Sequence, residues 1–150
     1  MSDKPEPIYT GGLQPLDGTL WTEGRGHSPS QLDTLQKEHW RWMEEVHAIL
    51  GTEPDVQMRL RRFAEEAAEL CQAGGLDFLT FIKVVTDAYS RPVGEFPQEI
   101  GGTMVTLLCL AAAKGQSVDE CARREFTRID TPEMKQKIAD KQAIKAERGI

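Results

Sequence analysis

Residues 98–114 read QEIGGTMVTLLCLAAAK, and this stretch decides the fold. Apart from Gln98, Glu99 and two threonines, it is apolar on every side of a helical wheel up to Lys114. A helix that is apolar all round is enclosed by protein, so the sequence predicts a central helix surrounded by others. Glu99 then requires a partner, because a buried carboxylate is costly unless it is paired, hydrogen-bonded or bound to a metal.

Capping signals and helical periodicity predict the helices around this centre. Ser28 begins a capping box with Pro29 at the first helical position, and Gly51 ends the helix that follows. Further helices are expected over 55–73, 78–89, 118–129 and from 132 to the C-terminus, and no strand pattern is found. Asp77 is the expected cap of the helix over 78–89, and Ser117 begins a second capping box before the helix over 118–129. The sequence therefore predicts an all-α bundle of four or five main helices over 28–150, with antiparallel neighbours. Residues 1–27, rich in proline and glycine, are expected to form an arm that is loose or docked on a neighbour.

Composition narrows the class of protein. A chain of 150 residues is one domain by default, and its net charge of −6 argues against a general nucleic-acid binder, which needs a basic face. No apolar run approaches the roughly 18 uninterrupted residues of a membrane helix, and no signal pattern opens the chain. The three cysteines have no metal-binding spacing, so we expect reduced core residues at Cys71, Cys109 and Cys121 in a cytoplasmic protein.

Carboxylates on two predicted helices are the candidate site. The string RFAEEAAEL contains Glu65, Glu66 and Glu69, and the last two lie one above the other, a turn apart. Glu99 lies in the first turn of the central helix, where the helix dipole favours an anion. If the two helices pack together, these carboxylates repel one another unless a cation lies between them. A hard divalent ion, Mg²⁺ or Mn²⁺, is the natural occupant. The alternative is an ordinary solvated helix face.

The two motifs resemble a known family. EEAAE at 65–69 and EIGG at 99–102 are similar to the EExxE…ExxD signature of the all-α nucleoside triphosphate pyrophosphohydrolases, the MazG-like superfamily. This superfamily includes all-α dUTPases and phosphoribosyl-ATP pyrophosphohydrolase. The resemblance implies a Mg²⁺-dependent hydrolase that cleaves between the α and β phosphates and works as a dimer or tetramer. It implies metal ligands at Glu66, Glu69 and Glu99, with Glu65 as a ligand or as the residue that orients the attacking water.

The chain departs from the signature at one position. Gly102 stands where the family has aspartate, so the usual fourth ligand is missing. Asp87, near the end of the preceding helix, is the first candidate substitute, and Glu95 is the second.

A triphosphate also needs cations to bind it. Arg91 precedes the central helix directly, and arginine grips phosphate with two hydrogen bonds. Lys83, Lys137 and Lys141 are further candidates, although a solvated surface role is the ordinary interpretation of a lysine. Either Trp40 or Trp42 is a candidate for stacking on the base. Trp42 lies on the apolar stripe of its helix, where large aromatics usually belong to a core, so Trp40 is the freer candidate.

The sequence thus predicts a cytoplasmic, oligomeric hydrolase that releases pyrophosphate from an NTP or dNTP with Mg²⁺, for which Mn²⁺ can substitute. Because of Gly102, a catalytically silent helical module that binds nucleotide or a protein partner remains the alternative. A third interpretation is a structural oligomer in which the apolar helix is an interface and Glu99 is only capped. A dimer is expected as the smallest assembly, because one chain has few helices to surround its centre.

Overall fold

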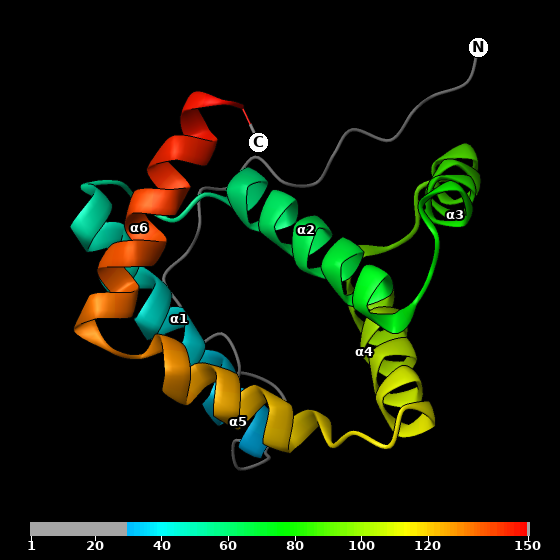
Figure 1. The fold of residues 1–150 in the computed structure, drawn as a ribbon, viewed down its shortest axis with the longest axis horizontal. Helices are drawn as coiled ribbons and strands as arrows, with labels where there is room; N and C mark the ends of the chain where they lie inside the picture. The colour runs from blue at the N-terminus through cyan, green and yellow to red at the C-terminus, as the bar shows by residue number, and fades with distance from the viewer. Residues whose placement is uncertain (1–29, 150) are drawn as a thin grey trace. The chain divides into compact units, whose positions relative to one another are not determined.

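The computed structural model describes residues 30–149, and its regular elements there are all α-helices (Figure 1). Within this range no strand occurs, so the predicted all-α class is confirmed. The predicted arm over 1–27 and the predicted cap at Ser28 and Pro29 lie outside the described residues. The helices are α1 (Gln31–Leu50), α2 (Val56–Gly74), α3 (Phe78–Ser90), α4 (Phe96–Ala113), α5 (Val118–Ile129) and α6 (Pro132–Glu147).

Side-chain caps fix several helix ends. Asp77 accepts the backbone N–H of Thr80 at 3.0 Å, and Ser117 accepts that of Glu120 at 3.3 Å, as the sequence predicts. Gly51 ends α1 with a φ of 66°, a left-handed conformation that glycine adopts without strain. The predicted start of α1 is wrong by two residues, because Ser30 is the N-cap and forms a reciprocal capping box with Asp33.

The chain divides into two compact units. Unit 1 contains the chain up to Arg59 together with the segment from Lys135 onward, so it is built from α1 and most of α6. In Figure 1, α6 crosses α1, and Lys135 pairs with Glu45 at 2.5 Å between the two helices. Met43, Val46 and Ala139 form the buried apolar core of this unit.

Unit 1 also buries polar groups. His47 is 1% exposed; its Nδ1 lies 2.9 Å from the hydroxyl of Thr52, and its Nε2 is buried without a hydrogen-bond partner. Burial lowers the pKa of His47, and the positive charge of Arg59 lowers it further, against weaker opposing effects of nearby acids. Folding therefore favours the neutral form of His47.

This burial predicts a loss of stability in mild acid. A histidine with a lowered folded pKa contributes its full stability above the unfolded pKa, about 6.5, and loses it as the pH falls through that value toward the folded one. We expect the unfolding temperature, followed by circular dichroism, to fall between pH 7.5 and 5 by more in the wild type than in His47→Asn, because asparagine keeps a polar group near Thr52 but does not titrate. Equal slopes in the two proteins would contradict this account.

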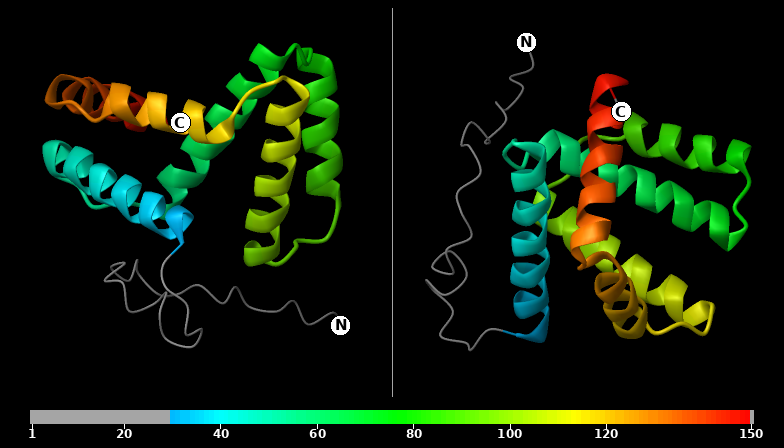
Figure 2. Two further views of the ribbon diagram at one scale, coloured as in Figure 1. Left: turned by 90° about the horizontal axis from the view of Figure 1, so that it is seen from below. Right: turned by 60° about the vertical axis from the view of Figure 1, so that its left-hand side comes forward.

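Unit 2 extends from Leu60 to Met134 and contains most of α2 with α3, α4 and α5. The chain reverses direction from α2 to α3 and again from α3 to α4 (Figure 2). Short connections predict this alternation. The ammonium group of Lys114 at the end of α4 donates to the carbonyl oxygen of Gly74 at the end of α2 at 3.1 Å, which connects two helix ends within the unit.

The predicted enclosure of α4 is wrong for the single chain. None of the residues of α4 is buried, although the helix has the expected apolar composition. The prediction of core cysteines is wrong for the same reason, since Cys109 is exposed and Cys71 and Cys121 are only half-buried. The helices of unit 2 expose many apolar side chains to solvent. The sequence correctly identifies these side chains as apolar, but it does not show that they are exposed in the single chain.

By length and composition, α4 is the one helix of the described residues that can cross a membrane. Its 18 residues contain a single charged side chain, Glu99, whereas the sequence led us to expect no segment of that kind. Soluble proteins contain core helices that meet the same test, so this observation alone does not assign a membrane location.

Candidate functional site

The first group of predicted site residues lies on α2. Glu65 is half-buried, and Glu66 and Glu69 are exposed. The guanidinium of Arg62 lies between the first two carboxylates: it donates to Glu65 and, at 2.5 Å, to Glu66. The positive charge of Arg62 therefore offsets the repulsion between neighbouring acids, which is the role that a metal ion would otherwise fill.

Glu99 lies in the first turn of α4, as the sequence predicts. The N-cap residue, Glu95, makes no side-chain hydrogen bond to the helix. Four N–H groups at a helix start have no partner within the helix, and the dipole there favours negative charge. Glu99 is exposed, so a hydrated ion has access to its carboxylate.

The position of the Glu99 carboxylate depends on Gly94. A Cβ added at Gly94 would overlap Oε1 of Glu99, so the side chain occupies the space that only a glycine leaves free. Gly94 lies in the exposed loop before α4. It is therefore a positioning residue for Glu99 that the sequence patterns did not single out.

Asp87 and Arg91, predicted as a substitute ligand and a phosphate-binding residue, pair with each other. Their charged groups lie 3.2 Å apart, and Arg91 Nε also donates to the carbonyl oxygen of Asp87 at 3.4 Å. Both side chains are more than half exposed, so the pair is weak and a ligand can separate it. Lys83 is exposed one turn before Asp87 on the same helix.

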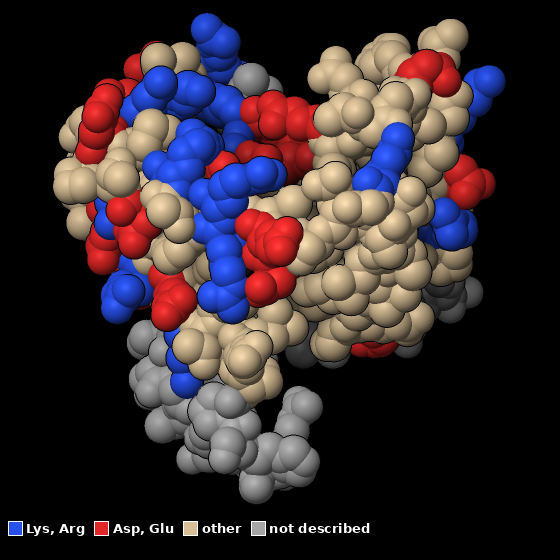
Figure 3. All heavy atoms as spheres, turned by 60° about the horizontal axis from the view of Figure 1, so that its bottom comes forward, with Lys and Arg blue, Asp and Glu red and all other residues tan. Residues whose placement is uncertain are grey.

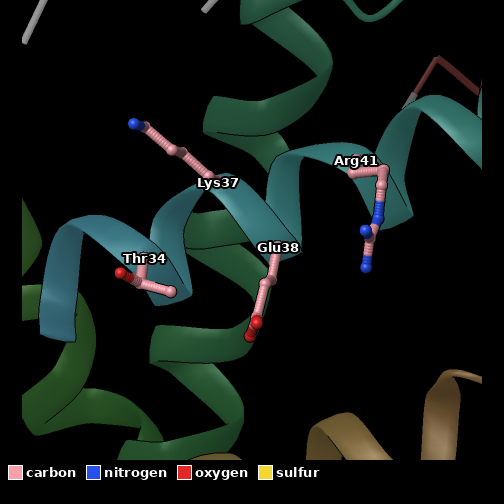
Figure 4. A pocket seen from close by; sticks show the side chains of 4 residues that line it. All are labelled: Thr34, Lys37, Glu38 and Arg41. Carbon is pink, nitrogen blue, oxygen red and sulfur yellow. The ribbon is translucent and has the colours of Figure 1, made fainter. Parts of the chain in front are cut away.

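The remaining candidates belong to unit 1. Lys137 and Lys141 are exposed on α6, and the indole N–H of Trp40 donates to Glu44 at 2.8 Å on α1. A shallow hollow on the outside of α1 is lined by Thr34, Lys37, Glu38 and Arg41 (Figure 4). All four side chains come from one helix, two of them are basic and one is acidic, and none of them is a predicted site residue. This hollow therefore gives no support to a nucleotide site.

Two arginines near the carboxylates were not predicted. Side chains three and four residues apart meet on a helix, so the ion pairs of Arg62 with Glu65 and Glu66 could have been predicted from the sequence. Arg128 comes from α5: Glu125 raises the pKa of Arg128, and the more distant Glu66 raises it slightly. Only the folded unit brings Arg128 within electrostatic range of the motif on α2.

The four glutamates are not gathered into a metal site in the single chain. Among residues 30–149, no group of three or more histidine, cysteine, aspartate or glutamate side chains is close enough to hold an ion. The acidic side chains lie on α2 and in the first turn of α4. Some of them pair with arginine, and most of them are exposed to solvent. Carboxylate oxygens are the ligands that Mg²⁺ and Mn²⁺ prefer, so the donor type is suitable.

No protein-family model, curated protein sequence or solved structure matches this chain. The resemblance to the MazG-like superfamily therefore depends on the residues of the two motifs.

The contact at Gly94 predicts a selective effect on Glu99. We expect Gly94→Ala to change the free energy of unfolding by less than about 1 kcal/mol, because the atom it meets is the end of a flexible side chain. It should weaken Mn²⁺ binding several-fold, measured by isothermal titration calorimetry, because the Glu99 carboxylate must move. Gly74→Ala is the matched control, since an added Cβ there has nothing within 4 Å. Equal affinities in both variants would mean that Glu99 is not a ligand.

Proposed function

We propose that this protein is a Mg²⁺-dependent nucleoside triphosphate pyrophosphohydrolase that converts an NTP or dNTP to the monophosphate and pyrophosphate. The observation that carries the proposal is the pair of motifs, EEAAE on α2 and Glu99 in the first turn of α4. Both sets of carboxylates lie within one compact unit, and Glu66, Glu69 and Glu99 are open to solvent. Because its substrates are intracellular nucleotides, the proposal includes a cytoplasmic location.

Glu66, Glu69 and Glu99 are the proposed ligands of the metal, with Asp87 as the fourth. When bound, Mg²⁺ neutralises phosphate oxygens and makes a bound water more acidic. Glu65 accepts the proton of the water that attacks the α phosphorus. The bond from that phosphorus to the bridging oxygen breaks, and the oxygen leaves with pyrophosphate. Hydrolysis in this form consumes one water and needs no other reactant.

Cations of the chain bind the phosphates in this proposal. Arg91 is close to Glu99 in sequence, and the solvent-exposed Asp87 that pairs with it can exchange one partner for another. Arg62 must likewise release Glu66 when a metal ion binds, because one carboxylate oxygen cannot serve both equally. Lys83 and Arg128 are further candidates in the same unit.

The motifs predict which substitutions abolish hydrolysis. We expect Glu66→Gln and Glu99→Gln each to lower pyrophosphate release from the preferred nucleotide at least about 100-fold, because each removes a charged ligand without changing its shape. The assay is pyrophosphate release from a panel of NTPs and dNTPs with Mg²⁺ or Mn²⁺. Glu133→Gln, an exposed glutamate on α6, is the control and should retain activity. Folded variants with wild-type rates would refute the proposed ligands.

Substitution of Gly102 by aspartate tests the metal site by an expected increase in Mn²⁺ affinity rather than a loss. An aspartate there lies one turn after Glu99, and the added Cβ has nothing within 4 Å, so the substitution is accommodated. We expect Gly102→Asp to tighten Mn²⁺ binding on the order of tenfold, measured by calorimetry, and Gly102→Asn, of the same shape but uncharged, to leave it unchanged. A Gly102→Asp protein with unaltered affinity would contradict the proposal that a metal ion is bound beside Glu99 within reach of position 102.

The second candidate function is a nucleotide-binding module without hydrolysis. It is favoured by two observations: glycine occupies position 102, and Arg62 already neutralises the acids of the first motif. Pyrophosphate release distinguishes the two functions. A silent module binds nucleotide in a calorimeter but releases no pyrophosphate with either metal.

A further inference from the structure

Arg62 holds two neighbouring acids of the first motif at once. Its Nη1 donates to a carboxylate oxygen of Glu65, and its Nη2 donates to Oε1 of Glu66 at 2.5 Å. All three residues lie on α2, at intervals of three and four, so about one helix turn suffices to form this bridge. Figure 3 shows that basic and acidic side chains lie against one another over the face of the protein that it draws. The bridge differs from a simple ion pair because one guanidinium occupies two carboxylates.

The two halves of the bridge differ in their exposure to solvent. The side chains of Arg62 and Glu65 are 30% and 36% exposed, whereas that of Glu66 is 64% exposed. Water and salt screen an ion pair less when its groups are partly buried. The contact with Glu65 is therefore the firmer half of the bridge. The contact with Glu66 is the half that a cation from solvent can replace.

A metal ion that binds Glu66 competes with Arg62 for this carboxylate. Oε1 of Glu66 accepts a hydrogen bond from Nη2, which must open before the same oxygen can bind a cation. A ligand binds more weakly in proportion to the fraction of the protein that is competent to bind it. Arg62 therefore raises the metal concentration at which the site fills, and it does so before any nucleotide is present.

Displacement from Glu66 frees one side of a group that keeps its charge. A guanidinium does not lose its proton in a protein, and Nη1 can remain on Glu65 while Nη2 leaves Glu66. The freed nitrogen then needs an anionic acceptor, and arginine binds phosphate oxygens with directional hydrogen bonds. A phosphate chain held by the metal ion supplies such oxygens beside Glu66.

We propose that Arg62 couples metal binding to phosphate binding: it occupies Glu66 until a metal ion displaces it, and its freed nitrogen then binds a phosphate oxygen. Both ligands favour the state in which Arg62 and Glu66 are apart. By linkage, each ligand therefore raises the affinity of the protein for the other. The inference rests on the proposed function, because it takes Glu66 as a metal ligand and a triphosphate as the substrate.

Calorimetric titration of the full-length protein with Mn²⁺ alone tests the competition. Arg62→Gln should bind Mn²⁺ about fivefold more tightly than the wild type, because the competitor for Glu66 is gone. Arg61→Gln is the matched control: it removes the same charge at the adjacent, exposed position of α2 and should change the affinity less than about twofold. Equal Mn²⁺ affinities of Arg62→Gln and Arg61→Gln would overturn the proposal.

Titration with inorganic triphosphate in excess Mn²⁺ tests the phosphate contact. Arg62→Gln should bind triphosphate at least about fivefold more weakly than the wild type, and Arg61→Gln should bind it as the wild type does. A variant that has merely lost structure weakens both ligands, so opposite changes in Mn²⁺ and triphosphate affinity distinguish the proposed coupling from a structural role. Triphosphate binding by Arg62→Gln that equals or exceeds that of the wild type contradicts the coupling.

Arg62→Lys replaces Arg62→Gln if the latter fails to fold. Lysine keeps the charge, but its ammonium is a point charge and does not reproduce the fork that bridges Glu65 and Glu66. Both affinities should change in the directions given for Arg62→Gln, by smaller factors. Wild-type affinities for both ligands would refute the bridge as a competitor.

The coupling and the proposed hydrolysis fail in different ways. Coupled binding of Mn²⁺ and triphosphate without pyrophosphate release supports the role of Arg62 and refutes hydrolysis alone. Hydrolysis with Mn²⁺ affinity that is indifferent to Arg62→Gln refutes the coupling alone. A wild type and an Arg62→Gln variant that both fail to bind Mn²⁺ overturn the two together.

Discussion

The apolar helix α4 is the constraint on which the rest of the structure depends. Eighteen residues with one charged side chain must be removed from water, and the three other helices of unit 2 leave all of them at least partly exposed. Monomeric soluble proteins rarely expose apolar patches larger than a few hundred Å². Within unit 2, α4 is therefore only partly removed from water.

The electrostatics of the site follow from the same helix. Glu99 is the single charged residue of α4 and lies in its first turn, at the positive end of the helix dipole. Three other acids pair with arginines: Arg62 binds Glu65 and Glu66, and Arg91 binds Asp87. The Arg91–Asp87 pair is more than half exposed and therefore weak, whereas Arg62 and Glu65 are 30% and 36% exposed. The structure is thus consistent with carboxylates that can exchange an arginine for a divalent cation, which is what the proposed hydrolase requires.

The sequence predicted what local chemistry determines. Asp77 and Ser117 cap their helices and Gly51 ends α1 because these effects act within a few residues. It did not predict that Val105, Leu108 and Cys109 of α4 are exposed, because composition shows which side chains avoid water but not which surface covers them. The pairing of Arg62 follows from helical spacing. The effect of Glu66 on Arg128 depends on the packing of α2 and α5, which no local pattern contains.

The most direct measurement is a crystal structure of the wild-type protein grown with Mn²⁺, with the ion located by its anomalous scattering. The account predicts Mn²⁺ bound by Glu66, Glu69 and Glu99. Mn²⁺ bound away from these glutamates, or no ion bound to them, would contradict it.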